Sequence, residues 1–201
     1  MTVMRPRVSV FPKCYFDQLC RGEMDYLEWI RSAATLGGEG VEHYDGFFRS
    51  LTAADVDPVL EAMADTGQVS SMLCFSPDFK KCYVVDTGAT DGPQYPANII
   101  VFDVANNALR NGKVFADFKP GFTDGIRCDT DGNVWCGWGW GGVDTNGVRV
   151  HAPSGDLLAF LHTPEVIANL CFGGTKRNRL FMTGSTSIYA LYVNAVGAAL
   201  S

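Results

Sequence analysis

The sequence has little positive charge and no long hydrophobic segment. Its 201 residues include 16 Lys and Arg against 22 Asp and Glu, which gives a formal net charge of −6. Binding to nucleic acid needs a basic face, so this balance argues against nucleic acid as the main partner. No apolar run approaches the roughly 18 residues of a membrane-spanning helix, so we expect no membrane partner. The N-terminal run MTVMRPRVSVF has neither the apolar core nor the cleavage site of a signal peptide.

The cysteines lack the spacing of a metal site or a disulfide framework. They are seven, an odd number, and none forms a C-x-x-C pair. Most lie in apolar strand-like runs, where a cysteine behaves as a small hydrophobic residue. We therefore predict a reduced, cytoplasmic chain. The seven positions are Cys14, Cys20, Cys74, Cys82, Cys128, Cys136 and Cys171.

The first third of the chain alternates strand and helix patterns. Short β-rich runs at 8–11, 40–44 and 69–75 are separated by helical periodicity over 25–36 and 52–65. The order β-α-β-α-β with short loops predicts parallel strands joined by right-handed crossovers.

After residue 76 the pattern changes to short strands between turns, with no amphipathic helix. Three segments align as strand, polar turn and strand, beginning at Leu73, Ile126 and Leu170, 53 and 44 residues apart. A repeat of about 40–50 residues with short strands is typical of propeller blades. This part predicts two to three blades.

The second part resembles the SMP-30/gluconolactonase family, which are six-bladed propellers that hydrolyse lactones with a bound metal. The resemblance is carried by FSPDFKKCYVVDTG (75–88), DGIRCDTDGNVWCGWGWGG (124–142) and NLCFGGTKRNRLFMTGSTSIYALYV (169–193). It implies a divalent cofactor, calcium or zinc, and a sugar lactone as the small-molecule partner. The expected fold over residues 76–201 is an all-β partial propeller.

The first part is similar to a different family, the sugar-phosphate isomerase/epimerase TIM barrels. The similar runs are VSVFPKCYFDQLCRGEMDYLEWIRSAATLGGEGVEHYDGF (8–47) and LTAADVDPVLEAMADTG (51–67). This implies a partial TIM-barrel segment over residues 1–75 and a mixed fold class for the chain. A natural fusion, a recombination product and an engineered chimera all fit such a join. We expect two weakly coupled lobes, with open strand edges that allow self-association.

The lactonase resemblance implies the site residues. In that family a Glu, an Asn and an Asp of an x-Asp-Gly step hold the metal, and the Asp also acts as the base. Asp124, in Thr123-Asp124-Gly125, matches the last of these and is the expected catalytic residue and metal ligand. Ser71 stands where the Asn is expected, so the metal shell is incomplete. Asn169, at the start of the next repeat, is the expected substrate-binding residue, with a turn cap as the alternative.

Three further features have competing interpretations. The run Asp129-x-Asp131-x-Asn133 lacks the later residues of an EF-hand and predicts a hairpin turn. The alternation of Trp135, Trp138 and Trp140 predicts one shared strand face, used for sugar stacking or for packing between blades. Glu42 and His43 follow the second strand and are interpreted as structural, as are His151 and His162, with a sugar contact by Glu42 as the alternative.

Three functions follow from these patterns. The first is a metal-dependent hydrolase of sugar lactones, impaired by its incomplete shell. The second is a fragment of a sugar-phosphate isomerase or epimerase. The third is a non-catalytic chimeric remnant that associates through its strand edges.

Overall fold

The computed structural model describes residues 9–37, 40–42, 47, 53–66, 69–70, 73–90, 92–105 and 108–198. The chain divides into two compact units, Met1–Ser71 and Met72–Ser201. This division falls a few residues before the expected boundary at residue 75. Strand pairing explains the difference, because residues 69–70 pair within the first unit and residues 73–75 pair within the second.

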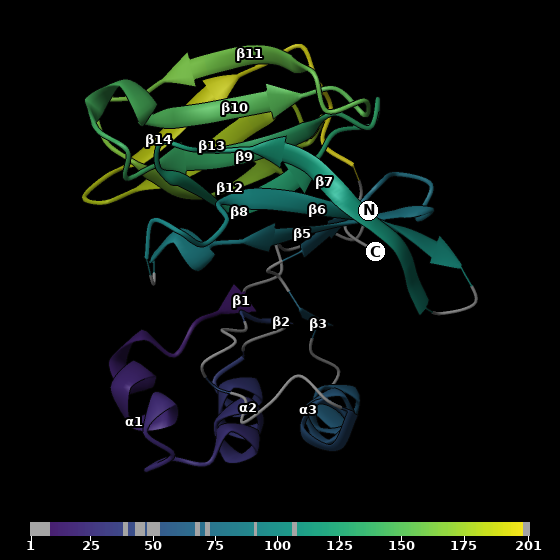
Figure 1. Cartoon of the computed structure of the whole chain (residues 1–201), viewed down its shortest axis with the longest axis vertical. Coiled ribbons are helices and arrows are strands. Elements are labelled where there is room, and N and C mark those ends of the chain that lie inside the picture. Colours follow the sequence, from purple (N-terminus) through teal and green to yellow (C-terminus); the bar gives the residue numbers. More distant parts are fainter. Residues whose placement is uncertain are drawn as a thin grey trace. The chain divides into compact units, whose positions relative to one another are not determined.

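The first unit is a small parallel sheet with helices (Figure 1). Strands β1 (Ser9–Val10), β2 (Gly40–Val41) and β3 (Val69–Ser70) pair in that order, and both pairings are parallel. Between them lie α2 (Tyr26–Thr35) and α3 (Ala53–Thr66), as the sequence predicts. The short helices η1 (Lys13–Tyr15) and α1 (Phe16–Cys20) were not predicted.

Local sequence explains where α2 begins and which face it buries. The Asp25 carboxylate accepts a hydrogen bond from the Glu28 backbone N–H at 2.9 Å, which caps the first turn. Tyr26, Trp29, Ile30 and Ala33 recur at helical spacing and are all buried. They pack in one core with Val59, Ala62 and Met63 of α3.

The second unit consists of three antiparallel sheets (Figure 1). The first has the order β4-β5-β6-β7, the second β11-β10-β9-β8, and the third β12-β13-β14. The strands are β4 (Leu73–Phe75), β5 (Lys81–Asp86), β6 (Asn98–Ala105), β7 (Ala108–Asp117), β8 (Phe122–Cys128), β9 (Val134–Gly139), β10 (Gly147–His151), β11 (Leu157–His162), β12 (Ile167–Gly173), β13 (Arg179–Gly184) and β14 (Ile188–Tyr192). The 3₁₀ turns η3 (Gly88–Thr90) and η4 (Val143–Thr145) lie in loops.

Each of the three predicted repeats forms one sheet of the second unit. The three aligned segments form the hairpins β4–β5, β8–β9 and β12–β13, each of which opens its sheet. The expected all-β organisation after residue 76 is confirmed: the region forms antiparallel sheets, and its described part has no α-helix. The TIM-barrel identity of the first unit stays a prediction, because a three-strand parallel sheet with helices is common to many folds.

Two apolar cores hold the three sheets together. The core between the first and second sheets contains Tyr83, Ile99, Ile126 and Trp138, and the core between the second and third contains Trp135, Val148, Leu170 and Leu180. Trp135 and Trp138 therefore face opposite sides of β9. The expectation that the tryptophans share one face was wrong, because an odd separation of three residues reverses direction in a strand.

The cysteines serve as small core residues in the second unit. All seven are thiols, and Cys74, Cys82, Cys128 and Cys136 are buried. The Cys74 and Cys128 sulfur atoms lie 3.7 Å apart. Hydrogen bonding to Cys128 and burial both raise the pKa of Cys74 well above its usual value, so this thiol stays protonated. Among the described helices, none is long and apolar enough to cross a membrane.

Candidate active site

Asp124 and Asn169 lie on neighbouring strands of adjacent sheets. Asp124 is the third residue of β8 and Asn169 the third of β12, and each strand is the first along the chain in its sheet. Residues of β8 and β12 are in direct contact along these strands. Both side chains are partly buried. The two residues selected from the sequence therefore lie on strands that contact each other.

A β-bulge interrupts β8 at Asp124. Thr123 pairs with Trp138 and Ile126 with Cys136, so Asp124 and Gly125 together face one residue of β9, Gly137. The buried Thr123 hydroxyl donates to the Gly137 carbonyl oxygen at 2.6 Å, which fixes the backbone at this point. Bulges change the direction of a side chain and are common beside active sites.

A second bulge precedes Asn169 on β12. Ile167 pairs with Gly184 and Asn169 with Thr183, which leaves Ala168 as the extra residue. The Asn169 side-chain Oδ1 accepts a hydrogen bond from the Leu170 N–H at 2.8 Å. Its backbone oxygen accepts one from the Thr183 hydroxyl at 3.2 Å. Asn169 is therefore held at both its side chain and its backbone.

Gly125 makes the close approach of the two bulges sterically feasible. A methyl group at Gly125 would lie 2.7 Å from the Asn169 Cα and still closer to its side-chain oxygen. The position therefore excludes any side chain, which is a physical reason for glycine after Asp124. The Asp-Gly step consequently sets the distance between the second and third sheets at the site.

Two glycines of β9, the strand that pairs with β8, also allow a close approach to the third sheet. A Cβ at Gly137 would lie 2.5 Å from the Ile167 carbonyl oxygen, and one at Gly139 would lie 2.5 Å from the Val166 Cβ. These glycines face the third sheet while Trp138 faces the first. The Gly/Trp alternation thus permits close packing on one side and fills a core on the other.

The described residues do not provide a complete metal cage. No three His, Cys, Asp or Glu side chains in the described part of the chain are grouped as metal ligands. Asp124 and Asn169 supply one carboxylate and one amide oxygen, whereas calcium takes six to eight oxygens and zinc about four ligands. Ser71, at the position of the family's Asn, lies outside the described residues. The fit to a divalent cation is therefore partial.

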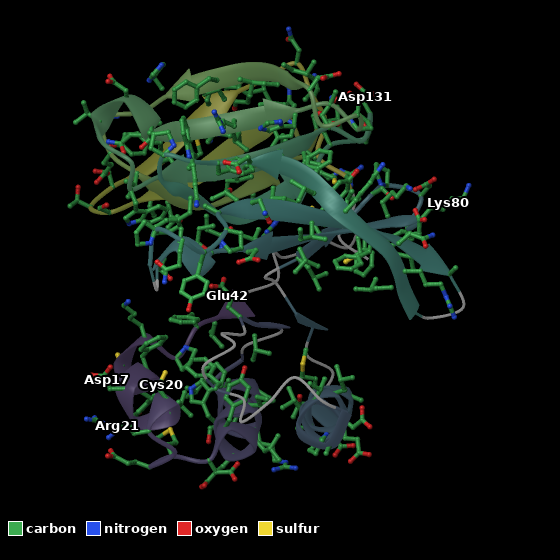
Figure 2. All side chains as sticks on the ribbon, in the orientation of Figure 1. Asp17, Cys20, Arg21, Glu42, Lys80 and Asp131 are labelled. Carbon is green, nitrogen blue, oxygen red and sulfur yellow. The ribbon has the colours of Figure 1, made fainter. Side chains whose placement is uncertain are left out.

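Asp129 has a structural role in the turn after β8. It is 1% exposed. Its carboxylate accepts hydrogen bonds from the Asp131 N–H, from the backbone N–H and side-chain amide of Asn133, and from the Trp135 indole N–H. Four protein donors occupy this carboxylate, so the run is a hairpin turn, as predicted, and not a cation loop. Figure 2 shows Asp131 projecting from the same turn, which lies beyond the end of β8 opposite to Asp124.

The remaining candidates belong to elements other than β8 and β12. Glu42 directly follows β2 in the first unit, where its N–H donates to the Val10 oxygen at 3.0 Å (Figure 2). His43 lies outside the described residues. His151 is buried in β10 with its Nδ1 2.9 Å from the Gly155 oxygen, and His162 ends β11 beside the Phe160 ring. Both positions agree with the structural interpretation.

The pairing of Trp140 with Phe122 was not predicted, although sugar stacking was one of the two roles expected for the tryptophans. Phe122, at the start of β8, stacks on Trp140, with ring centroids 4.4 Å apart and planes at 6°. Trp140 is 44% exposed and has a positive φ of 64°. Sequence reasoning grouped Trp140 with two buried tryptophans, and its left-handed backbone is the reason that it departs from their pattern.

Comparison with known proteins shows the family to which the sequence is similar. The sequence model described as "SMP-30/Gluconolactonase/LRE-like region" matches residues 33–186. Lactonohydrolase oryH of Aspergillus oryzae is 26% identical over 155 residues, which cover 68% of this chain and 32% of the relative. An uncharacterised protein of Sulfolobus acidocaldarius is 26% identical over 137 residues, covering 66% of this chain and 46% of the relative.

Solved structures show the same fold. A protein assigned provisionally as a gluconolactonase has a TM-score of 0.54 and 32% identity, over 64% of this chain and 40% of that one. A gluconolactonase of Xanthomonas campestris has a TM-score of 0.51 and 31% identity, over 60% and 36%. Regucalcin of Agrobacterium tumefaciens, a calcium-binding protein, has a TM-score of 0.50 and 20% identity, over 65% and 47%. The chain thus spans less than half the length of each of these relatives.

Proposed function

We propose that the β8–β12 site hydrolyses sugar lactones. The premise is that this chain belongs to the SMP-30/gluconolactonase/LRE-like family. Asp124 is the general base in this proposal, and Asn169 contacts the substrate. The observation that carries the proposal is the contact of Gly125 with Asn169, which joins two bulges at the point where the sequence places its two candidate residues. Lactone hydrolysis is also the activity in the name of the Aspergillus oryzae relative.

The chemistry needs a base and a donor on opposite sides of the lactone carbonyl. The Asp124 carboxylate accepts a proton from water as the water oxygen bonds to the carbonyl carbon. The bond from that carbon to the ring oxygen then breaks, and the ring oxygen takes up the proton from Asp124, which gives the open hydroxy acid and restores the carboxylate. Asn169 is the residue proposed to contact the substrate oxygens, and its side chain is already held by the Leu170 N–H.

We also propose a cofactor for this site. The family relationship favours a divalent cation, calcium or zinc, with Asp124 as one ligand. Because the described residues offer only a partial shell, we propose that metal-dependent turnover is impaired in this chain. Calcium or zinc added at millimolar concentration should change the rate little, and tight binding of one ion per chain would contradict this.

The test is hydrolysis of glucono-1,5-lactone in a pH-stat, with spontaneous hydrolysis subtracted. Asp124→Asn should lower the rate about 100-fold, the usual contribution of a general base. Asp131→Asn is the matched control, because Asp131 is an exposed aspartate in the turn beyond the same strand. Equal rates for the wild type and Asp124→Asn would refute the role of Asp124, and a wild-type rate equal to the spontaneous one would refute hydrolysis.

The isomerase alternative rests on the first unit. Its parallel order β1-β2-β3 is that of a barrel opening, and Glu42 follows the carboxyl end of β2, where barrel enzymes place functional residues. Sugar isomerisation lost on Glu42→Gln would favour it. The non-catalytic remnant is the outcome if neither activity is found, and the cytoplasmic location stays a prediction.

A further inference from the structure

An exposed aromatic pair stands at the start of β8. The rings of Phe122 and Trp140 stack nearly parallel, with their centroids 4.4 Å apart. Trp140 is 44% exposed, whereas Trp29, Trp135 and Trp138 are 8%, 7% and 6% exposed. A stacked and partly exposed aromatic pair of this kind offers a flat apolar surface to a ligand.

The backbone holds Trp140 in a conformation that side chains rarely adopt. Its φ of 64° lies in the left-handed region, which is unfavourable for a bulky residue. Residues kept in such conformations cluster at ligand-binding sites, where the surrounding structure fixes them. Trp140 is 44% exposed, whereas Trp138 packs in the core between the first and second sheets.

Neighbouring contacts make the position rigid. The hydroxyl of buried Thr145 accepts a hydrogen bond from the Gly141 N–H at 3.0 Å and donates one to the Gly142 oxygen at 2.7 Å. A Cβ at Gly121 would lie 2.8 Å from the Gly141 nitrogen, so the segments before β8 and after β9 are tightly packed. A ring fixed in this way loses little entropy when a ligand stacks on it.

The pair lies within reach of the proposed catalytic residue. Phe122 and Asp124 are two residues apart on β8, on either side of Thr123. The Thr123 hydroxyl donates a hydrogen bond to the Gly137 carbonyl oxygen. Two residues of a strand span about 7 Å along its axis, so Phe122 lies close to the bulge that carries Asp124. A six-membered sugar ring that stacks beside Phe122 can place its carbonyl carbon near Asp124.

We infer that Phe122 and Trp140 form a stacking platform for the sugar ring of the lactone. The axial C–H bonds of a pyranose-like ring make an apolar face, which fits a flat indole, while its hydroxyls stay in water. The inference rests on the proposed function and adds the residues that recognise the substrate class. It predicts selectivity for ring-form sugar lactones over short aliphatic lactones.

Fluorescence tests the platform without turnover. The ligand is glucono-1,5-lactam, in which an amide replaces the hydrolysable ester. Because Trp140 is far more exposed than the other three tryptophans, it dominates quenching by acrylamide. Saturating lactam should protect the wild type from acrylamide, and the protection should disappear in Trp140→Leu. Unchanged quenching at saturating lactam would overturn the platform.

Kinetics gives a second readout that a structural role would not produce. Trp140→Leu should raise the KM for glucono-1,5-lactone about tenfold with kcat nearly unchanged, whereas Trp140→Phe, which keeps an aromatic face, should stay near the wild type. Tyr192→Leu is the control, since Tyr192 is an aromatic residue 71% exposed on β14. If Trp140→Leu fails to fold, the KM of Phe122→Leu and the protection of the wild type from acrylamide are measured instead. Equal KM values for wild type, Trp140→Leu and Phe122→Leu would overturn the platform.

The two proposals fail separately. Lactam protection of Trp140 in a chain that does not hydrolyse lactone would refute the proposed function and support the platform. Hydrolysis that depends on Asp124, with no lactam effect on Trp140, would support the proposed function and refute the platform.

Discussion

Two aspartates five residues apart on one hairpin have different environments. Asp129 is 1% exposed and accepts four hydrogen bonds, so it is committed to the turn. Asp124 is partly buried at a bulge, beside the strand that carries Asn169. The bulge, and not the aspartate itself, distinguishes the candidate catalytic residue from the structural one.

Gly125→Ala should damage the site through sterics alone. The added methyl would lie 2.7 Å from the Asn169 Cα, so one of the two bulges must move, at a cost of about 1–3 kcal/mol in the free energy of unfolding. Lactone hydrolysis should fall with it. Gly92→Ala is the control, because its methyl meets only the Gln94 side-chain end, which can rotate away. Thermal melts and initial rates equal to the wild type would show that the approach at Gly125 is unimportant.

His151 should make stability depend on pH. Burial lowers the pKa of His151 below its usual value of 6.5, so the folded state keeps the imidazole neutral. Below pH 6.5 the unfolded chain binds the proton first, and stability is therefore lost as the pH falls through the folded pKa. His151→Gln should flatten the decline of the melting temperature between pH 7 and 5, whereas His162→Gln, at an exposed position, should not. A decline of the same slope in both variants would exclude His151 as its source.

At the scale of elements, the outer strand β14 differs from the outer strand β7. β14 reads Ile-Tyr-Ala-Leu-Tyr, without charge or proline, and Ile188 is 76% exposed. β7 carries Arg110, Lys113 and Asp117, charges of the kind that discourage edge pairing. Within the described residues, β14 pairs only with β13.

We predict that the chain self-associates through β14. Ile188→Lys should shift the sedimentation profile toward the monomer, because an ammonium group on the edge must be desolvated for another strand to pair. Leu109→Lys on β7 is the matched control, as Leu109 is also an exposed apolar edge residue (46%). A wild type that sediments as a monomer at all concentrations would end this prediction.

The sequence predicts the strands and hairpins better than it predicts the site. Hairpins β8–β9 and β12–β13 follow from local turn residues and apolar runs, and α2 follows from the Asp25 cap and its periodicity. The Asp-Gly step selects Asp124, but the close approach of Gly125 to Asn169 depends on bulges in two separate strands. The exposure of Trp140 depends on one backbone angle set by contacts distant in sequence, for which the alternation of glycine and tryptophan gives no signal.

At the scale of the whole molecule, the chain has two units, and the candidate site belongs to one of them. Asp124, Asn169 and Trp140 all lie in Met72–Ser201. The family model begins at residue 33 and so extends into the first unit. The relation of residues 8–67 to sugar isomerases stays a prediction.

Residues 72–201 alone should keep the activity of the full chain. We expect equal kcat/KM for glucono-1,5-lactone and equal sensitivity to Asp124→Asn, because the two apolar cores of the sheets are built within this unit. Circular dichroism checks that the shortened chain is folded. A folded unit without activity would contradict this prediction.

Amide chemical shifts of the second unit, recorded while glucono-1,5-lactam is added, locate the ligand most directly. The largest changes should fall on Phe122 to Gly125 and on Asn169, at the two bulges. Changes confined to the far turn around Asp131, or to β14, would contradict the assignment of this site.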